Sequence, residues 1–142
     1  MNASLLIDNS AWARLWSGSL PEPRADEIAD DLDSGRIAVC LPLLLEAGYS
    51  ARGPGDHDDL YDGMVAFPWI HIDRRVERIA LDAQAQLSRA GHHRMPPADL
   101  FIAALADRHE LGVLHYDNDF ELILERTDLE FHSEWLMPRG SL

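Results

Sequence analysis

Four acidic side chains occupy positions that suit the binding of a divalent cation. Asp8 and Asp117 each follow a short apolar run, whereas Glu46 and Asp99 lie early in apolar segments that follow a break in the chain. Carboxylates gathered in one pocket repel each other and shift their pKa values unless cations neutralise them. Carboxylate oxygens select Mg²⁺ or Mn²⁺ over Zn²⁺. The four acids therefore predict a site for Mg²⁺, with Mn²⁺ as a substitute, if the fold gathers them.

Each acid also has a purely structural explanation. Asp8 could simply cap the helix that follows it, and Asp99 could simply complement a helix dipole. Glu46 could be a solvated helix residue, but it is the only charge between Arg36 and Arg52, which favours a position facing a cleft or a metal. The case for chemistry therefore depends on the acids lying together.

The strands that must position these acids follow from the apolar pattern. Short continuous apolar runs predict buried strands, and strands that alternate with helical patterns predict a parallel sheet. We therefore expect an α/β fold with a mostly parallel sheet of four to five strands and helices on both faces. Ligands bind at the carboxyl edge of such sheets, where the acids can gather. The predicted strands are residues 5–7, 37–41, 69–72 and 112–115, with a fifth edge strand at 129–132.

Helices are expected between these strands. The segment 97–106 is almost wholly apolar, which predicts a buried helix. The helix expected at 21–34 carries a row of acids, which favours a solvated face, with a docking surface for a basic partner as the alternative. The other predicted helices are residues 11–16, 42–49, 56–67, 74–90 and 121–125.

Length and composition limit the class of protein. The 142 residues, 46% of them hydrophobic, predict one domain over residues 1–142, with a flexible tail from about residue 138 that could be partly vector-derived. No apolar run could span a bilayer, and residues 1–20 have only Arg14 as a basic group, so no signal peptide is expected. The single cysteine, Cys40, is expected in the core. These features predict a cytoplasmic protein that is not bound to a membrane.

The charge of the chain is strongly acidic. There are 25 acidic residues against 12 basic ones, and every basic residue is arginine. The lack of lysine excludes a Walker A phosphate loop and Schiff-base catalysis. A net charge of −13 is unsuited to a simple nucleic-acid coat and suits a cation binder or a protein with a basic partner.

Four segments occur in the order LIDNSAW, LPLLLEAGYS, RMPPADLFIAALA and VLHYDNDFELI. Together they resemble the ordered motifs of the PIN-domain nucleases, and in particular the VapC-type toxins of bacterial type II toxin–antitoxin pairs. The resemblance covers residues 4–132. It implies a PIN-like fold, an Mg²⁺-dependent endoribonuclease that cleaves RNA phosphodiester bonds, a cognate VapB-type antitoxin and a homodimer.

The resemblance also implies roles for the acids. A metal held by them would lower the pKa of a bound water and neutralise the charge that develops on the phosphoryl oxygens. No side chain need act as a covalent nucleophile. The residues that match the catalytic and metal-binding positions are Asp8, Glu46, Asp99 and Asp117, with Asp119 as an additional metal ligand.

Other residues in or near these motifs are candidates to orient the site or to contact substrate. Ser10 matches a small hydroxyl residue that commonly follows the first Asp, and His115 stands where the family usually has Thr or Ser. Arg94, Arg14 and Arg24 are candidates to hold RNA phosphates, and each could equally be a solvated charge or an ion-pair partner.

An apolar cluster follows the first strand. Trp12, Leu15 and Trp16 recur at helical spacing, and core packing alone accounts poorly for two tryptophans so close together. This cluster favours the homodimer that the family resemblance implies.

Two other functions remain open from the sequence. A catalytically inactive PIN-like module could act only by binding a partner protein, but such a site should have lost one or more of its acids. A metal-dependent phosphatase would usually have a second Asp two residues after the first, and Ser10 occupies that position.

Overall fold

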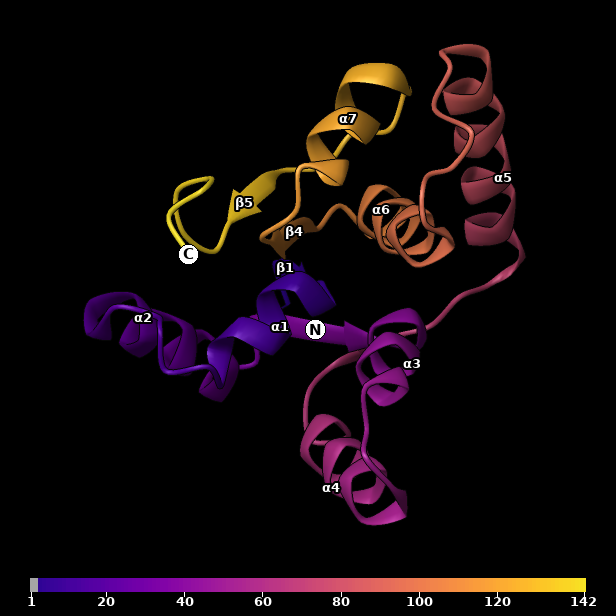
Figure 1. The fold of residues 1–142 in the computed structure, drawn as a ribbon. Helices are drawn as coiled ribbons and strands as arrows, with labels where there is room; N and C mark the ends of the chain where they lie inside the picture. The colour runs from indigo at the N-terminus through magenta and orange to yellow at the C-terminus, as the bar shows by residue number, and fades with distance from the viewer. Residues whose placement is uncertain (1–2) are drawn as a thin grey trace.

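The computed structural model describes residues 3–142, which fold around a central sheet (Figure 1). The strands are β1 (Leu5–Ile7), β2 (Ile37–Cys40), β3 (Trp69–Ile70), β4 (Gly112–His115) and β5 (Ser133–Trp135). Their order in the sheet is β3-β2-β1-β4-β5, and every neighbouring pair is parallel. The predicted parallel α/β sheet is therefore confirmed, with the first strand at its centre.

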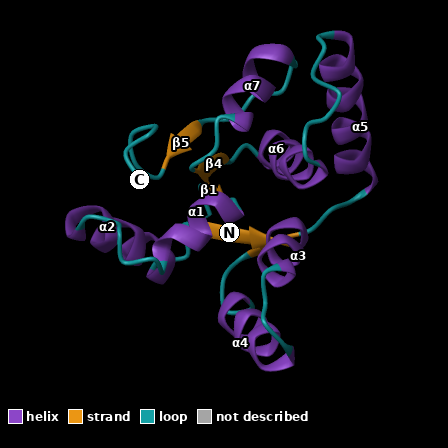
Figure 2. Cartoon of the chain, in the orientation of Figure 1, coloured by secondary structure: helices purple, strands orange, loops and turns teal. Residues whose placement is uncertain are grey.

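Helices surround the sheet (Figure 2). They are α1 (Asn9–Leu15), α2 (Glu22–Asp33), α3 (Leu41–Tyr49), α4 (Pro54–Met64), α5 (Arg74–Arg89), α6 (Pro97–His109) and α7 (Asp119–Arg126). Figure 1 shows α2 and α5 on opposite sides of the molecule. The predicted buried helix is α6, which packs against α3, α5 and α7. Within residues 3–142, no helix has both the length and the apolar character that crossing a membrane requires.

The middle of the sheet is buried on both faces. Every residue of β1, β2 and β4 is buried, which explains why these strands read as continuous apolar runs instead of alternating ones. Cys40 ends β2 in the core, as predicted, and burial raises the pKa of its thiol to about 12. The acids that follow these strands are therefore attached to a closely packed framework.

Gly112 begins β4 where the neighbouring strands leave no room for a side chain. A Cβ atom at this position would lie 2.9 Å from Cδ2 of Leu5 and 3.1 Å from the carbonyl oxygen of His132. The glycine therefore allows β4 to pass closely between β1 and the segment that leads into β5.

The fifth strand lies later in the chain than predicted. The apolar pattern at residues 129–132 favoured a strand there, but the strand that pairs with β4 is Ser133–Trp135. Leu129 and Phe131 pack against the core without belonging to the strand. The prediction was wrong because two of the three paired residues are polar, so apolar periodicity indicated the preceding segment instead.

Other boundaries differ from the prediction by a few residues. α4 begins at Pro54 and α7 at Asp119, because proline and acidic residues both suit the first turn of a helix. β3 ends at Ile70, before the predicted end of that strand. At the end of the chain, the N–H of Leu142 donates to the Tyr116 hydroxyl at 2.7 Å. The flexibility of the tail from residue 138 stays a prediction.

Candidate metal centre

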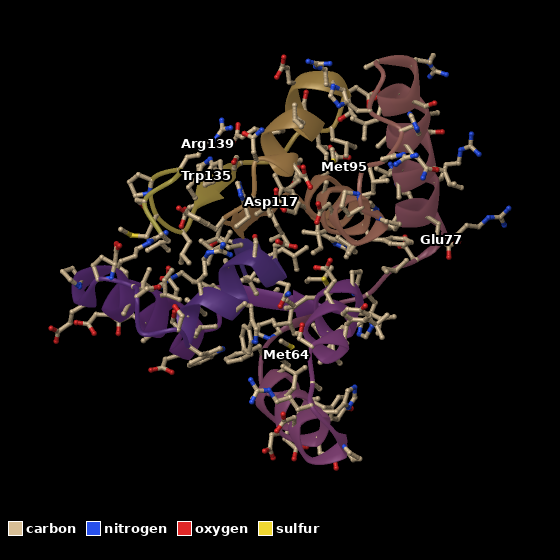
Figure 3. The ribbon with its side chains drawn as sticks, viewed as in Figure 1. Met64, Glu77, Met95, Asp117, Trp135 and Arg139 are labelled. Atoms are coloured by element: carbon tan, nitrogen blue, oxygen red, sulfur yellow. The ribbon has the colours of Figure 1, made fainter. Side chains whose placement is uncertain are left out.

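Five carboxylates converge at the carboxyl edge of the sheet. Oxygen atoms of Asp8, Glu46 and Asp99 lie within 4.8 Å of one another, and so do oxygen atoms of Asp99, Asp117 and Asp119. Asp99 belongs to both groups, so the fold gathers all five acids that the sequence singled out. Figure 3 shows Asp117 in the middle of the molecule, between the indigo α1 and the orange α6.

Asp8 caps a helix with only one of its two carboxylate oxygens. Oδ2 accepts hydrogen bonds from the backbone N–H of Ser10 at 2.9 Å and from the Ser10 hydroxyl at 2.6 Å, which caps α1. Oδ1 is buried and has no hydrogen-bond partner among the described residues. The structural and chemical explanations of Asp8 are therefore compatible, because the cap leaves one oxygen for another ligand.

Asp99 has a second orphaned oxygen. The residue lies in the first turn of α6, is 4% exposed, and its Oδ2 has no hydrogen-bond partner among residues 3–142. An unpaired polar atom in the interior is unfavourable, and far more so when it is charged. Two such oxygens, on Asp8 and Asp99, fit a hard divalent cation, which takes carboxylate oxygens as ligands.

Burial and neighbouring charges raise the pKa values of three of the five acids. Burial and the charge of Asp8, together with a hydrogen bond to Asp119, raise the pKa of Asp99 to about 9. Burial raises the pKa of Asp8, and the charge of Asp117 adds to that effect. The pKa of Glu46 is raised by burial first and then by the charges of Asp8 and Asp117. Without a cation, the site therefore retains protons that ordinary carboxyl groups would lose.

We expect Mn²⁺ to bind more tightly as the pH rises from about 6 to about 9, because Asp99 must release its proton to become a ligand. Calorimetry in buffers of different ionisation enthalpy measures that proton release, and Asp99→Asn should lower the number of protons released. In the metal-free protein, the stability is expected to change with pH in the direction opposite to the Mn²⁺ affinity. Its melting temperature should fall over the same range, because the pKa of Asp99 is higher in the folded than in the unfolded chain. Mn²⁺ binding that is independent of pH and releases no proton would contradict this prediction.

Ser10 joins the ends of the two central strands. Its hydroxyl donates to Asp8 and accepts the backbone N–H of Tyr116 at 2.9 Å. Because a hydroxyl has a single proton, these two contacts fix its orientation. Ser10 thereby sets the spacing between the residue after β1 and the loop after β4, which carries Asp117.

Asp117 is held through its backbone and its side chain. Its N–H donates to Nδ1 of His115 at 3.1 Å, and its Oδ1 accepts the backbone N–H of Asp119 at 2.9 Å. Burial lowers the pKa of His115 to about 4, so its ring is neutral at physiological pH. The sequence selected His115 as a candidate orienting residue, and the structure places its ring in contact with the backbone of Asp117.

Sequence reasoning missed Ser133, which contacts this histidine, and Glu121, which contacts Ser133. The Ser133 hydroxyl lies 2.7 Å from Nε2 of His115 and donates to the carboxylate of Glu121. Glu121 follows Asp119 by two positions, a spacing that could have drawn attention to it. Ser133 carried no comparable signal, because the predicted strand ended before it.

The three candidate arginines lie in different surroundings. Arg14 places its guanidinium 4.5 Å from the centre of the Tyr116 ring, beside the acid cluster. Arg24 forms an ion pair with Glu134 on β5 at 3.3 Å, so the alternative of a structural ion pair applies to it. Arg94 is exposed and lines a cavity of about 400 Å³ together with Asp119. Arg94 and Arg14 therefore remain the candidates for contacts with substrate.

An apolar groove adjoins the acid cluster. The groove has a volume of about 760 Å³, and Glu46 lines it as well as belonging to the cluster. Tyr49 on its wall is 93% exposed. A segment lying in this groove would therefore end close to the carboxylates. The apolar residues that line it include Leu41, Pro42, Leu45, Tyr49, Ile72 and Phe101.

Comparisons with known sequences agree with this architecture. The model of the family described as "PIN domain" matches residues 5–124. Ribonuclease VapC51 of Mycobacterium tuberculosis (strain ATCC 25618 / H37Rv) is 32% identical over 143 aligned positions, which cover 100% of this chain and 99% of the relative. Ribonuclease VapC18 of the same strain is also 32% identical, over 96% of this chain and 97% of the relative.

Solved structures share the fold at low sequence identity. A DNA-bound VapBC complex from Salmonella typhimurium contains a chain with a TM-score of 0.75 and 16% identity, covering 95% of this chain and 99% of that one. VapBC-5 from Mycobacterium tuberculosis, a member of a family of toxin–antitoxin systems, gives a TM-score of 0.64 and 21% identity over 94% of this chain and 99% of that one.

Proposed function

Because this chain belongs to the PIN domain family, with VapC ribonucleases among its relatives, we propose that it is an Mg²⁺-dependent endoribonuclease. Its proposed role is that of the toxin in a toxin–antitoxin pair. The observation that supports metal dependence is the pair of buried oxygens on Asp8 and Asp99 that have no hydrogen-bond partner within residues 3–142. They lie in a cluster of acids that supplies ligands of the type Mg²⁺ prefers.

The ligands divide into two groups that share Asp99. Asp8 and Glu46 complete one group, and Asp117 and Asp119 complete the other. When bound, Mg²⁺ would acidify a coordinated water and neutralise charge on the phosphoryl oxygens. The acids supply the ligand oxygens, and Ser10 keeps Asp8 turned toward the cluster by occupying its other oxygen.

RNA must approach a strongly acidic protein, so cationic side chains near the cluster are needed to hold its phosphates. Arg94 is exposed beside Asp119, and we assign it a phosphate contact. Arg14 lies on α1, the helix that follows β1, where its guanidinium donates to the carbonyl of Ser10 at 2.8 Å. We place the activity in the cytoplasm, where RNA is available.

The partner that we propose is a VapB-type antitoxin. The neighbouring structures described as VapBC contain toxin and antitoxin together. In this chain, the apolar groove beside Glu46 suits an amphipathic segment of such a partner. Binding of that segment would bury the exposed apolar side chains of the groove.

The test is cleavage of RNA by the purified protein. We expect cleavage with Mg²⁺ or Mn²⁺, loss of cleavage in excess EDTA, and recovery when the metal is restored. Cleavage that persists in EDTA, or no cleavage with either metal, would refute the proposal. Release of inorganic phosphate from a phosphorylated small molecule, without RNA cleavage, would indicate a phosphatase instead.

We also expect the protein to form a homodimer, as proposed from the tryptophans that follow the first strand. Trp12 is buried in the core, but Trp16 is 67% exposed and packs edge-on against it, so core packing accounts for only one of the two. Light scattering at tens of micromolar, on the order of concentrations where weak specific association shows, should give twice the chain mass. A monomer mass would contradict the prediction, and Trp16→Ser should move the mass toward that value.

A further inference from the structure

The imidazole of His115 is fully buried at the carboxyl end of β4, and both of its nitrogens are used. Nδ1 accepts the backbone N–H of Asp117 at 3.1 Å, so in the neutral ring the proton belongs on Nε2. Nε2 therefore donates to the Ser133 hydroxyl, 2.7 Å away. The ring is held in one tautomer by two contacts on opposite sides.

The hydrogen bonds continue beyond Ser133. Because its oxygen accepts from His115, the Ser133 hydroxyl proton is directed to Glu121 Oε1, which also accepts the indole N–H of Trp135 at 3.1 Å. The donors therefore run in one direction, from the Asp117 backbone through the ring and the hydroxyl to a carboxylate. Figure 3 labels Trp135 on β5, where Trp135 pairs with His115 of β4.

Aromatic side chains hold the ring of His115 in place. The centres of the Phe120 and Trp135 rings lie 4.9 Å and 4.7 Å from the centre of the imidazole. A flip of the ring would remove the acceptor from Asp117 and the donor from Ser133 together. The imidazole is therefore a fixed support and not a freely rotating side chain.

The turn that this ring supports carries two of the five acids. Asp117 follows the histidine by two residues, and its side chain accepts the backbone N–H of Asp119, the first residue of α7. Resting on the proposed metal-dependent function, we propose that His115 is a positioning residue whose Nε2–H tautomer fixes the turn that presents Asp117 and Asp119 to the cation. It acts through the Asp117 backbone and does not contact the metal.

A matched pair of amide substitutions tests this proposal. In His115→Asn, the amide oxygen can take the place of Nδ1 and accept the Asp117 N–H. In His115→Gln, the longer amide reaches toward the position of Nε2 and leaves that N–H without its acceptor. Both changes remove the aromatic ring, so a role in packing alone predicts equal effects.

Two measurements that need no RNA separate these outcomes. In the metal-free protein, hydrogen exchange of the Asp117 amide should stay slow in His115→Asn and become fast in His115→Gln. Calorimetry should show Mn²⁺ affinity falling by about 10- to 100-fold in His115→Gln, the usual loss when a group that orients a metal ligand is removed. The affinity of His115→Asn should lie closer to that of the unmodified protein.

Equal losses in the two variants, with equal exchange at Asp117, would overturn the proposal. If neither variant folds, the imidazole ¹⁵N shifts of the unmodified protein decide the matter, and a proton on Nδ1 of His115 would overturn it. A protein that binds Mn²⁺ with the expected difference between variants but cleaves no RNA would refute the nuclease function and leave the positioning role in place.

Discussion

Replacing Asp8 or Asp99 with asparagine is expected to lower RNA cleavage by at least about 100-fold, the scale of loss when one preorganised electrostatic group is removed from an active site. Each change replaces a carboxylate, one of whose buried oxygens has no partner in the part of the chain that the structure describes, with a neutral amide of similar shape. The amide is a poor ligand for Mg²⁺, so Mn²⁺ binding measured by calorimetry should weaken in parallel. Cleavage assays with saturating metal check the first expectation.

The same two variants should fold, and they should be at least as stable as the unmodified protein without metal. Like charges crowd this site, and burial disfavours ionisation, so removing one acid relieves both effects. Asp58→Asn on the exposed face of α4 is the matched control, because it removes one acid far from the cluster. Unchanged turnover in both Asp8→Asn and Asp99→Asn would refute the metal site.

The proposed antitoxin is expected to inhibit by placing an arginine, or another basic group, beside Asp8, Glu46, Asp99 and Asp117. A cluster of carboxylates lacking its metal has a strong negative potential, and a guanidinium can bind carboxylates through two parallel hydrogen bonds while remaining charged. The groove that leads to Glu46 gives an apolar segment of the partner a route to this point. Such an arginine would displace the metal or block the entry of phosphate.

Titrating the partner into an RNA cleavage assay tests this mechanism. Inhibition should weaken as salt or Mg²⁺ rises, because the acidic faces of α2 and α4 attract a basic partner and salt screens that attraction. Substituting alanine for the partner arginine should restore cleavage, whereas the same change at an arginine outside the contact should not. Full inhibition by the alanine variant would mean that covering the site, without inserting a charge, is sufficient.

The acids were predictable because each stands beside an apolar segment. Asp8 ends a short apolar run that predicts a buried strand, and Glu46 is isolated in apolar sequence. The orphaned state of Oδ1 on Asp8 was not predictable, because it depends on which oxygen Ser10 occupies. Contacts between distant segments, such as His115 with Ser133, were beyond reach for a similar reason. These contacts form because β4 pairs with β5. The polar residues of β5 gave it no apolar pattern from which it could be predicted.

The two tryptophans illustrate another limit of sequence patterns. Trp12 and Trp16 share a helical face, and periodicity assigns both to the same surface. Only Trp12 lies within the core, because Trp16 is the residue at which α1 ends and the chain turns away. The pattern predicted the helix correctly but could not indicate which of its residues are buried in the core and which are exposed.

The order of the strands has a consequence for the synthesis of this protein. The central strand β1 is made first, yet its neighbour β4 is made more than two thirds of the way along the chain. Parallel pairings between such distant segments form late in folding. On the ribosome, a nascent chain that has not yet reached Asp119 lacks part of the acid cluster, whatever has already folded. On the proposed function, a chain that ends before β4 should therefore cleave RNA far less than the full chain, because it lacks the strand that pairs with β1 and the two acids that follow it.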